Sequence, residues 1–126
     1  MIRVEHVYHD YGGKGKYAVS DISFTVEDGR ILGFLGPSGA GKSTIQNIMT
    51  GLLPLQRGEV LYEGQSVRKL NTRFFNRIGV SFEQSNLYSS LTGIENLRYY
   101  AALFSVPTVP PMELLERVGL REDANK

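Results

Sequence analysis

The stretch Gly36 to Thr44 (GPSGAGKST) has the residue types and the spacing needed to hold a phosphate group. It fits the pattern G-x-x-x-x-G-K-[ST] at every fixed position. Glycines allow backbone N–H groups to converge on phosphate oxygens with no Cβ in the way. The stretch therefore predicts a P-loop that binds a nucleoside triphosphate. Its predicted nucleotide-binding residues are Gly36, Pro37, Ser38, Gly39, Ala40, Gly41, Lys42, Ser43 and Thr44.

Three polar side chains at the end of this loop have distinct expected roles. A helix that begins near Lys42 would direct its positive dipole end at the anion, and the ammonium of Lys42 would contact the β and γ phosphates. This contact gives Lys42 a predicted catalytic role. The Ser43 hydroxyl is placed to ligate Mg²⁺, and Thr44 can donate a hydrogen bond to the α-phosphate. ATP and Mg²⁺ are thus the predicted ligands.

Composition limits the other chemistry open to the chain. The 126 residues carry a net charge of +1, with 41% hydrophobic residues and no cysteine. Absence of cysteine excludes disulfides and thiolate metal sites, and the balanced charge argues against a nucleic-acid partner. His6 and His9 lack ligand partners at metal spacing, so they are expected to be solvated strand residues. No apolar run is long enough to span a membrane and no leader pattern begins the chain, which predicts a cytoplasmic protein.

The elements around the loop follow from hydrophobic periodicity. Alternating patterns predict strands at residues 2–7 and 19–26. Residues 58–67 predict another strand, with a turn at Glu63-Gly64. The continuous apolar run at residues 30–36 predicts a strand buried on both faces of a mostly parallel sheet. Residues 77–83 predict a further strand.

Three helices are expected. The first follows the loop and ends near Gly51; its apolar face comprises Ile45, Ile48, Met49 and Leu52. The second begins at a capping box, Thr92 to Glu95, and runs to about Phe104 with an apolar face of Ile94, Leu97, Ala101 and Phe104. The third begins at Pro111 and ends at Gly119, with Met112, Leu115 and Val118 facing inward.

The chain resembles the nucleotide-binding domain of ATP-binding cassette (ABC) ATPases. The resemblance rests on Tyr11 and on three stretches: DGRILGFLGPSGAGKST, MTGLLPLQRGEVLYEG and RIGVSFEQSNLYSSLTGIENLRYYAALF. It implies an α/β fold: a P-loop NTPase core of ABC type, with an antiparallel β-subdomain at the N-terminus and the start of the α-helical subdomain at the C-terminus. Residues 1–126 would be a partial domain, with the ATP-binding core in 1–84 and the Q-loop region and helical subdomain in 85–126.

The resemblance implies further site residues. Tyr11 occupies the position of an aromatic that stacks on adenine, although Tyr8 or Tyr17 could take that role, or Tyr11 could pack on the sheet. The family's Q-loop glutamine, which contacts Mg²⁺ and the attacking water, aligns with Glu83, and Gln84 follows one residue later. Glu83 would be a metal ligand and a catalytic residue, but its charge lies beside an anionic phosphate. A local shift would give the role to Gln84.

Several parts that the family uses for hydrolysis are not found in this sequence. No apolar run ends in Asp-Glu, no signature of the SGG type is present, and both histidines precede the P-loop. The chain alone is therefore expected to bind ATP without turnover.

The expected function is the ATP-binding half of an export-like ABC transporter ATPase. It would pair with a second nucleotide-binding domain and attach to the inner face of the cell membrane through a permease. The alternatives are a stand-alone module without turnover and a soluble, non-transport ABC ATPase. Leu87 and Tyr88 are the candidate residues for docking the permease, unless they pack on the helix that follows.

Overall fold

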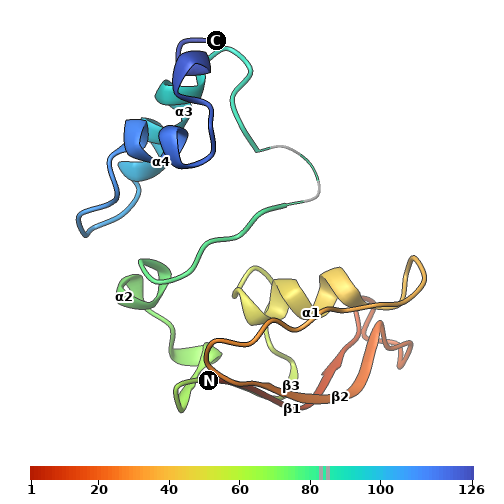
Figure 1. Cartoon of the computed structure of the whole chain (residues 1–126). Coiled ribbons are helices and arrows are strands. Elements are labelled where there is room, and N and C mark those ends of the chain that lie inside the picture. Colours follow the sequence, from red (N-terminus) through yellow and green to blue (C-terminus); the bar gives the residue numbers. More distant parts are fainter. Residues whose placement is uncertain (83, 85) are drawn as a thin grey trace. The chain divides into compact units, whose positions relative to one another are not determined.

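The computed structural model describes residues 1–82, 84 and 86–126 (Figure 1). By internal contacts the chain divides into two compact units, Met1–Asn71 and Thr72–Lys126. The functional division after residue 84 stays a prediction, because contact density alone defines these units.

The first unit is built on a four-stranded sheet with the order β2-β1-β3-β4. Its strands are β1 (Ile2–His9), β2 (Val19–Val26), β3 (Arg57–Tyr62) and β4 (Gln65–Ser66). All neighbouring strands pair antiparallel, which confirms the predicted N-terminal β-subdomain. The hairpin of β3 and β4 turns at Glu63-Gly64 as predicted.

The core of this unit lies between the sheet and helix α1 (Lys42–Met49), which covers one face (Figure 1). Val4 in the central strand β1 lies opposite Val60 of β3. Both valines are buried together with Ile45 and Ile48 of α1. The predicted apolar face of the helix is thus confirmed for its first three members, and the fourth, Leu52, is exposed.

A tyrosine joins the sheet to the end of α1. The Tyr62 hydroxyl of β3 donates a hydrogen bond of 2.6 Å to the Met49 carbonyl. Burial raises the pKa of Tyr62 to about 12. This bond fixes the helix that follows the P-loop against the strand beneath it.

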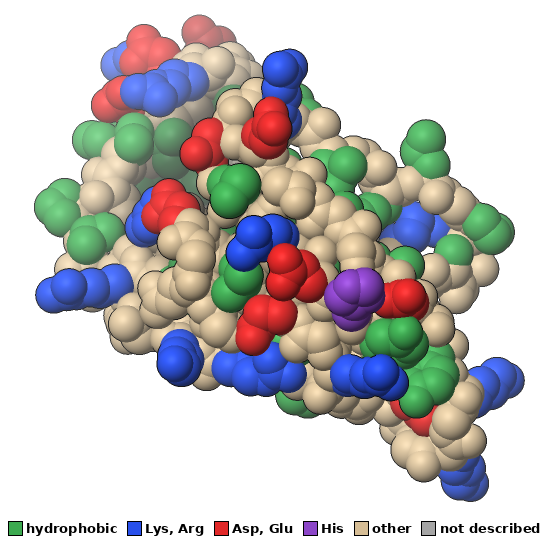
Figure 2. Space-filling model, turned by 90° about the horizontal axis from the view of Figure 1, so that it is seen from below, with side chains coloured by type: hydrophobic (Ala, Val, Ile, Leu, Met, Phe, Trp, Pro, Cys, Tyr) green, Lys and Arg blue, Asp and Glu red, His purple; other side chains and the backbone are tan. Residues whose placement is uncertain are grey.

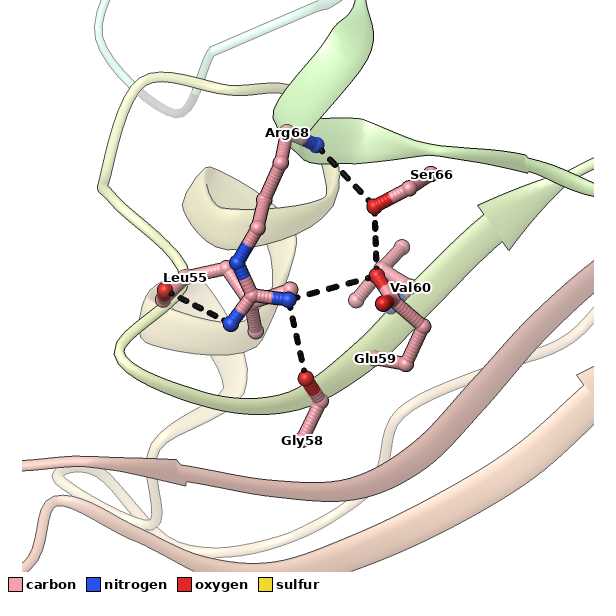
Figure 3. Close-up of polar contacts among 6 residues, drawn as sticks. All are labelled: Leu55, Gly58, Glu59, Val60, Ser66 and Arg68. Atoms are coloured by element: carbon pink, nitrogen blue, oxygen red, sulfur yellow. Dashed lines mark hydrogen bonds and ion pairs between the residues drawn. The ribbon is translucent and has the colours of Figure 1, made fainter.

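Arg68 organises the turn that leads from α1 into β3 (Figure 3). It lies in the short 3₁₀ helix η1 (Val67–Lys69), and its guanidinium donates to the carbonyls of Leu55 and Gly58, both at 3.1 Å. The same group lies 3.4 Å from the Glu59 carboxylate, which also accepts a bond of 2.6 Å from the Ser66 hydroxyl. The planar guanidinium thereby satisfies two backbone carbonyls with its fixed set of donors.

The predicted buried strand at residues 30–36 is not formed. The segment has no ladder partner among the described residues, and the side chains of Ile31 and Leu35 are fully exposed. The Phe34 ring packs edge-on to Phe24 of β2 at a ring-centroid distance of 5.3 Å. A strand buried on both faces needs hydrogen-bonded neighbours and two covering layers, and the antiparallel sheet described here supplies neither.

The strand predicted at residues 77–83 is also not formed over its described residues. Residues 77–82 form no strand, and the side chains of Val80 and Phe82 are exposed. Residue 83 lies outside the described residues.

The second unit is helical. Its elements are α2 (Thr72–Phe75), α3 (Gly93–Ala101), α4 (Pro111–Arg117) and the 3₁₀ helix η2 (Arg121–Asp123). Among the described residues, its buried core comprises Ile94, Leu115 and Ala124, with Leu97 packed against them. No helix in the described part of the chain is long and apolar enough to cross a membrane.

The start of α3 confirms the predicted capping box. The Thr92 amide donates to the Glu95 carboxylate at 2.8 Å, and the Thr92 hydroxyl accepts from the Glu95 amide at 3.4 Å. The hydrogen bond from the Thr92 amide is the main cause that lowers the pKa of Glu95. The helix ends at Ala101, three residues before the predicted end, and leaves Phe104 exposed.

Helix α4 begins at Pro111 as predicted, but its inner face is narrower than expected. Only Leu115 of the three predicted core residues is buried, while Met112 and Val118 are exposed. Helix α4 has only seven residues, so Leu115 is the one buried side chain that it packs against Ile94 and Leu97 of α3.

Candidate functional site

The predicted P-loop connects the segment 30–36, which has no regular secondary structure, to the first turn of α1. Its backbone turns through Gly39 (φ 80°) and Gly41 (φ 86°), both in the left-handed region that favours glycine. The Ala40 amide donates to the Pro37 carbonyl at 3.3 Å and closes the turn. A Cβ on Gly41 would lie 2.5 Å from the Ala18 carbonyl oxygen, so the loop backbone packs directly against the chain that enters β2.

The Lys42 ammonium lies across this loop. Its Nζ donates to the carbonyls of Gly36 and Pro37, each at 2.7 Å. An ammonium has three donors, so these bonds leave one donor for another acceptor. The arrangement places a positive charge against the backbone of the loop that the sequence predicts to hold phosphates.

The two residues after Lys42 differ in exposure. Ser43 is exposed in the first turn of α1, whereas Thr44 is buried. The Thr44 hydroxyl lies 3.0 Å from the Tyr11 hydroxyl and forms a hydrogen bond with it. The fold therefore brings Tyr11, predicted from the sequence to contact the base, to the helix of the P-loop.

Tyr11 is 64% exposed, and its ring stands edge-on to the ring of His9, with centroids 4.6 Å apart and planes at 79°. His9 is buried, which corrects the expectation of a solvated histidine: the last residue of β1 lies beneath the tyrosine ring. His6 is exposed as expected and contacts Asp21 at 2.7 Å. Among the described residues, no group of three or more His, Cys, Asp or Glu side chains could hold a metal ion.

The alternative aromatics pack differently. Tyr8 and Tyr17 meet edge-on at 5.6 Å, and the Arg57 guanidinium lies 4.4 Å above the Tyr8 ring. Neither has a described hydrogen bond to the P-loop, whereas Tyr11 has one.

Asp10 is a site residue that the sequence analysis missed. Its carboxylate accepts hydrogen bonds from the amides of Gly12 (2.9 Å) and Gly15 (2.6 Å), on either side of the glycine-rich loop after β1. The bond from Gly12 is the main cause that lowers the pKa of Asp10, against the opposing effect of burial. The available signal was an aspartate two residues before a glycine, the pattern of a turn closed by its own side chain.

The predicted Q-loop residues are only partly described. Glu83 lies outside the described residues, and Gln84 is exposed. The roles of both stay predictions.

Charge on the surface is mixed. Figure 2 shows Lys and Arg side chains among Asp and Glu on one face, with hydrophobic side chains between them. The net charge of +1 is consistent with this mixture. No nucleic-acid partner is expected from such a face, and that expectation stays a prediction.

Residues 19–126 match the model of a family described as ABC transporter. A fluoroquinolones export ATP-binding protein of Mycobacterium tuberculosis (strain H37Rv) is 44% identical over 125 residues, which are 99% of this chain and 42% of that protein. An uncharacterized ABC transporter ATP-binding protein of Bacillus subtilis (strain 168) is 39% identical over 110 residues, covering 86% of this chain and 36% of that protein. The chain thus spans less than half the length of either relative.

Solved structures share the fold. An ATP-binding subunit of an ABC transporter has a TM-score of 0.80 at 23% identity, covering 100% of this chain and 53% of that chain. A dimeric ATP-binding cassette in a post-hydrolysis state, bound to ADP and Pi, has a TM-score of 0.79 at 26% identity. The match covers 99% of this chain and 60% of that chain. These matches confirm the predicted ABC-type ATPase fold, and through the family match the chain belongs to the ABC transporter family.

Proposed function

We propose that this chain binds Mg²⁺-ATP at residues 36–44 and is the ATP-binding part of an ABC ATPase that powers transport. One observation carries the proposal: the Lys42 ammonium is bonded to the carbonyls of a loop that turns at glycines, and the helix after this loop also binds the hydroxyl of an exposed aromatic, Tyr11. A cation and backbone N–H groups can bind the phosphates of a nucleoside triphosphate, and an aromatic ring can stack on its base.

The residues present suit Mg²⁺ as well. The exposed Ser43 hydroxyl in the first turn of α1 is a hard oxygen ligand next to Lys42. Bound Mg²⁺ would neutralise charge on the β and γ phosphates. Glu83 or Gln84 would complete the ligand set in the full protein, as the family resemblance implies. Lys42 would hold the γ-phosphate and stabilise its charge during transfer.

The whole protein would work as a dimer of nucleotide-binding domains at the inner face of the membrane. A related cassette of known structure is dimeric, and a relative at 44% identity is named for export. On this basis we propose export as the direction of transport and a membrane permease as the second partner. Hydrolysis would require the paired full-length domains, since a base and a partner signature are needed beside the P-loop.

Base stacking by Tyr11 is the first test of this function. Tyr11→Ala should weaken ATP binding by about 1–3 kcal/mol and leave the affinity for inorganic triphosphate unchanged, because stacking contacts only the base. Calorimetric titration of both ligands measures the difference. Tyr17→Ala removes a comparable half-exposed ring that contacts Tyr8 instead of the P-loop helix, and should leave both affinities unchanged.

Two results would contradict the assignment. An equal loss for both ligands in Tyr11→Ala would mean that Tyr11 supports the fold and not the base. A wild-type protein that binds neither ligand would refute the nucleotide site itself.

We further propose that Leu87 and Tyr88 contact the permease. They are 59% and 46% exposed, although they lie in a segment that is firmly held. The buried Asn96 side chain binds both the amide (2.8 Å) and the carbonyl (3.0 Å) of Tyr88. The Tyr88 ring stands edge-on to Tyr99 at 4.9 Å, and their hydroxyls are hydrogen-bonded at 3.2 Å. A rigid, exposed aromatic is the kind of residue that anchors interfaces.

Tyr88→Ala should uncouple transport from ATP binding in the full transporter while nucleotide affinity is unchanged. Tyr88→Phe keeps the ring and loses only the bond to Tyr99, so it should transport as the wild type does. Transport by reconstituted vesicles and calorimetric ATP affinity measure the two properties. Undiminished transport in Tyr88→Ala would refute the docking role, and a protein that no longer folds would show that Tyr88 supports the fold instead.

A further inference from the structure

The glycine-rich loop after β1 is closed by one side chain. The Asp10 carboxylate is buried and bonds to the amides of Gly12 and Gly15 with its two oxygens, at 2.9 and 2.6 Å. A loop with glycines at three of four successive positions has many accessible backbone conformations. Holding it in one of them costs conformational entropy, which contacts within the loop must offset. Asp10 therefore fixes both arms of the loop that contains Tyr11.

Asp10 is itself held at its backbone. The Gln56 side chain accepts from the Asp10 amide at 2.8 Å and donates to the Asp10 carbonyl at 3.0 Å. Strand pairing between β1 and β3 ends at Tyr8 and Arg57. The Gln56 amide thus continues the ladder beyond the last backbone pair, because it offers one donor and one acceptor as a strand neighbour does.

Tyr11 follows Asp10 directly and reaches the P-loop helix through one bond, 3.0 Å to the Thr44 hydroxyl. Gln56 holds the backbone of Asp10, and Asp10 is joined directly to Tyr11. These contacts therefore lead to the Tyr11 ring, the face of which is proposed to stack on adenine. We propose that Asp10 is a positioning residue for base recognition: it holds the 11–15 loop closed and so fixes the Tyr11 ring beside the P-loop. This role rests on the proposed ATP site.

The test compares two ligands in the protein expressed at full length. Asp10→Ala should weaken ATP binding about tenfold, within the range of the stacking that it supports, and leave inorganic triphosphate affinity unchanged. In a Tyr11→Ala background the same substitution should cause no further loss of ATP affinity. Asp28→Ala removes the charge of an exposed turn aspartate that bonds to the N-terminal amine, and should change neither affinity.

A second measurement needs no nucleotide. Amide hydrogen exchange at Gly12 and Gly15 should accelerate in Asp10→Ala, since their acceptor is removed. Asp10→Asn retains one acceptor oxygen and should give an intermediate effect; it also serves if Asp10→Ala does not fold. Unchanged hydrogen-exchange rates at these two amides in Asp10→Ala would overturn the proposal, whatever the change in ATP affinity.

The outcomes separate the two proposals. Equal weakening of ATP and triphosphate would show that Asp10 acts on the fold as a whole, and would overturn the positioning role alone. Unchanged ATP affinity in Asp10→Ala would do the same. A wild-type protein that binds neither ligand would refute the ATP site, and the positioning role with it.

Discussion

Replacing Lys42 by alanine should abolish most of the affinity for Mg²⁺-ATP. Lys42 is the one lysine or arginine in residues 36–44, and its ammonium is bonded to the Gly36 and Pro37 carbonyls at 2.7 Å. Loss of a charged hydrogen-bond donor to a polyphosphate costs about 2–4 kcal/mol, or about 30- to 1000-fold in affinity. Calorimetric titration of ATP into the wild-type and Lys42→Ala proteins measures the change.

Lys69→Ala is the matched control. Lys69 is an exposed lysine in η1, and its removal changes the net charge by the same amount. ATP affinity should be unaffected by this change. Equal affinity of the wild-type and Lys42→Ala proteins would exclude residues 36–44 as the phosphate site, and with it the proposed function.

Gly41→Ala should destabilise the first unit more than other changes in the P-loop. The new Cβ would meet the Ala18 carbonyl oxygen at 2.5 Å and Val19 Cγ2 at 3.2 Å, and the backbone is held at a φ of 86°. Backbone strain and the forced shift together cost about 2–4 kcal/mol. Denaturant unfolding without nucleotide measures the loss in free energy of unfolding.

Gly39→Ala separates the two causes. Gly39 has nearly the same conformation, with a φ of 80°, but a Cβ there would meet nothing within 4 Å. It should therefore cost only the conformational strain, about 1–2 kcal/mol. If both substitutions destabilise equally, contact with the Ala18 carbonyl contributes nothing, and the packing of the loop on β2 is looser than described.

Local signals in the sequence predicted much of the fold. The Thr92 capping box and the Glu63-Gly64 turn are each decided within a few residues, because a cap or a turn satisfies its own neighbouring backbone groups. The P-loop is equally local, since its glycines, lysine and helix start are contiguous. These elements appear at or within a few residues of the predicted positions.

The failures are non-local. Residues 30–36 have the apolar run of a buried strand, and residues 77–82 the pattern of a further strand. A strand forms only where other strands pair with it, and local composition does not say whether they do. Asn96 and Gln56 were missed for a related reason: each binds backbone distant in the chain, at Tyr88 and Asp10. An amide side chain in a polar position gives no sign of such a partner.

The fold of Lys42 back onto Gly36 and Pro37 also has a kinetic consequence. Before an anion binds, the loop carbonyls are bonded to the Lys42 ammonium. The conformational entropy of the loop is therefore lost during folding and not during association with the anion. A polyphosphate then enters a preorganised ring and exchanges with carbonyl acceptors already in place. Association at this site should therefore be limited by diffusion and charge and not by the time the loop takes to order.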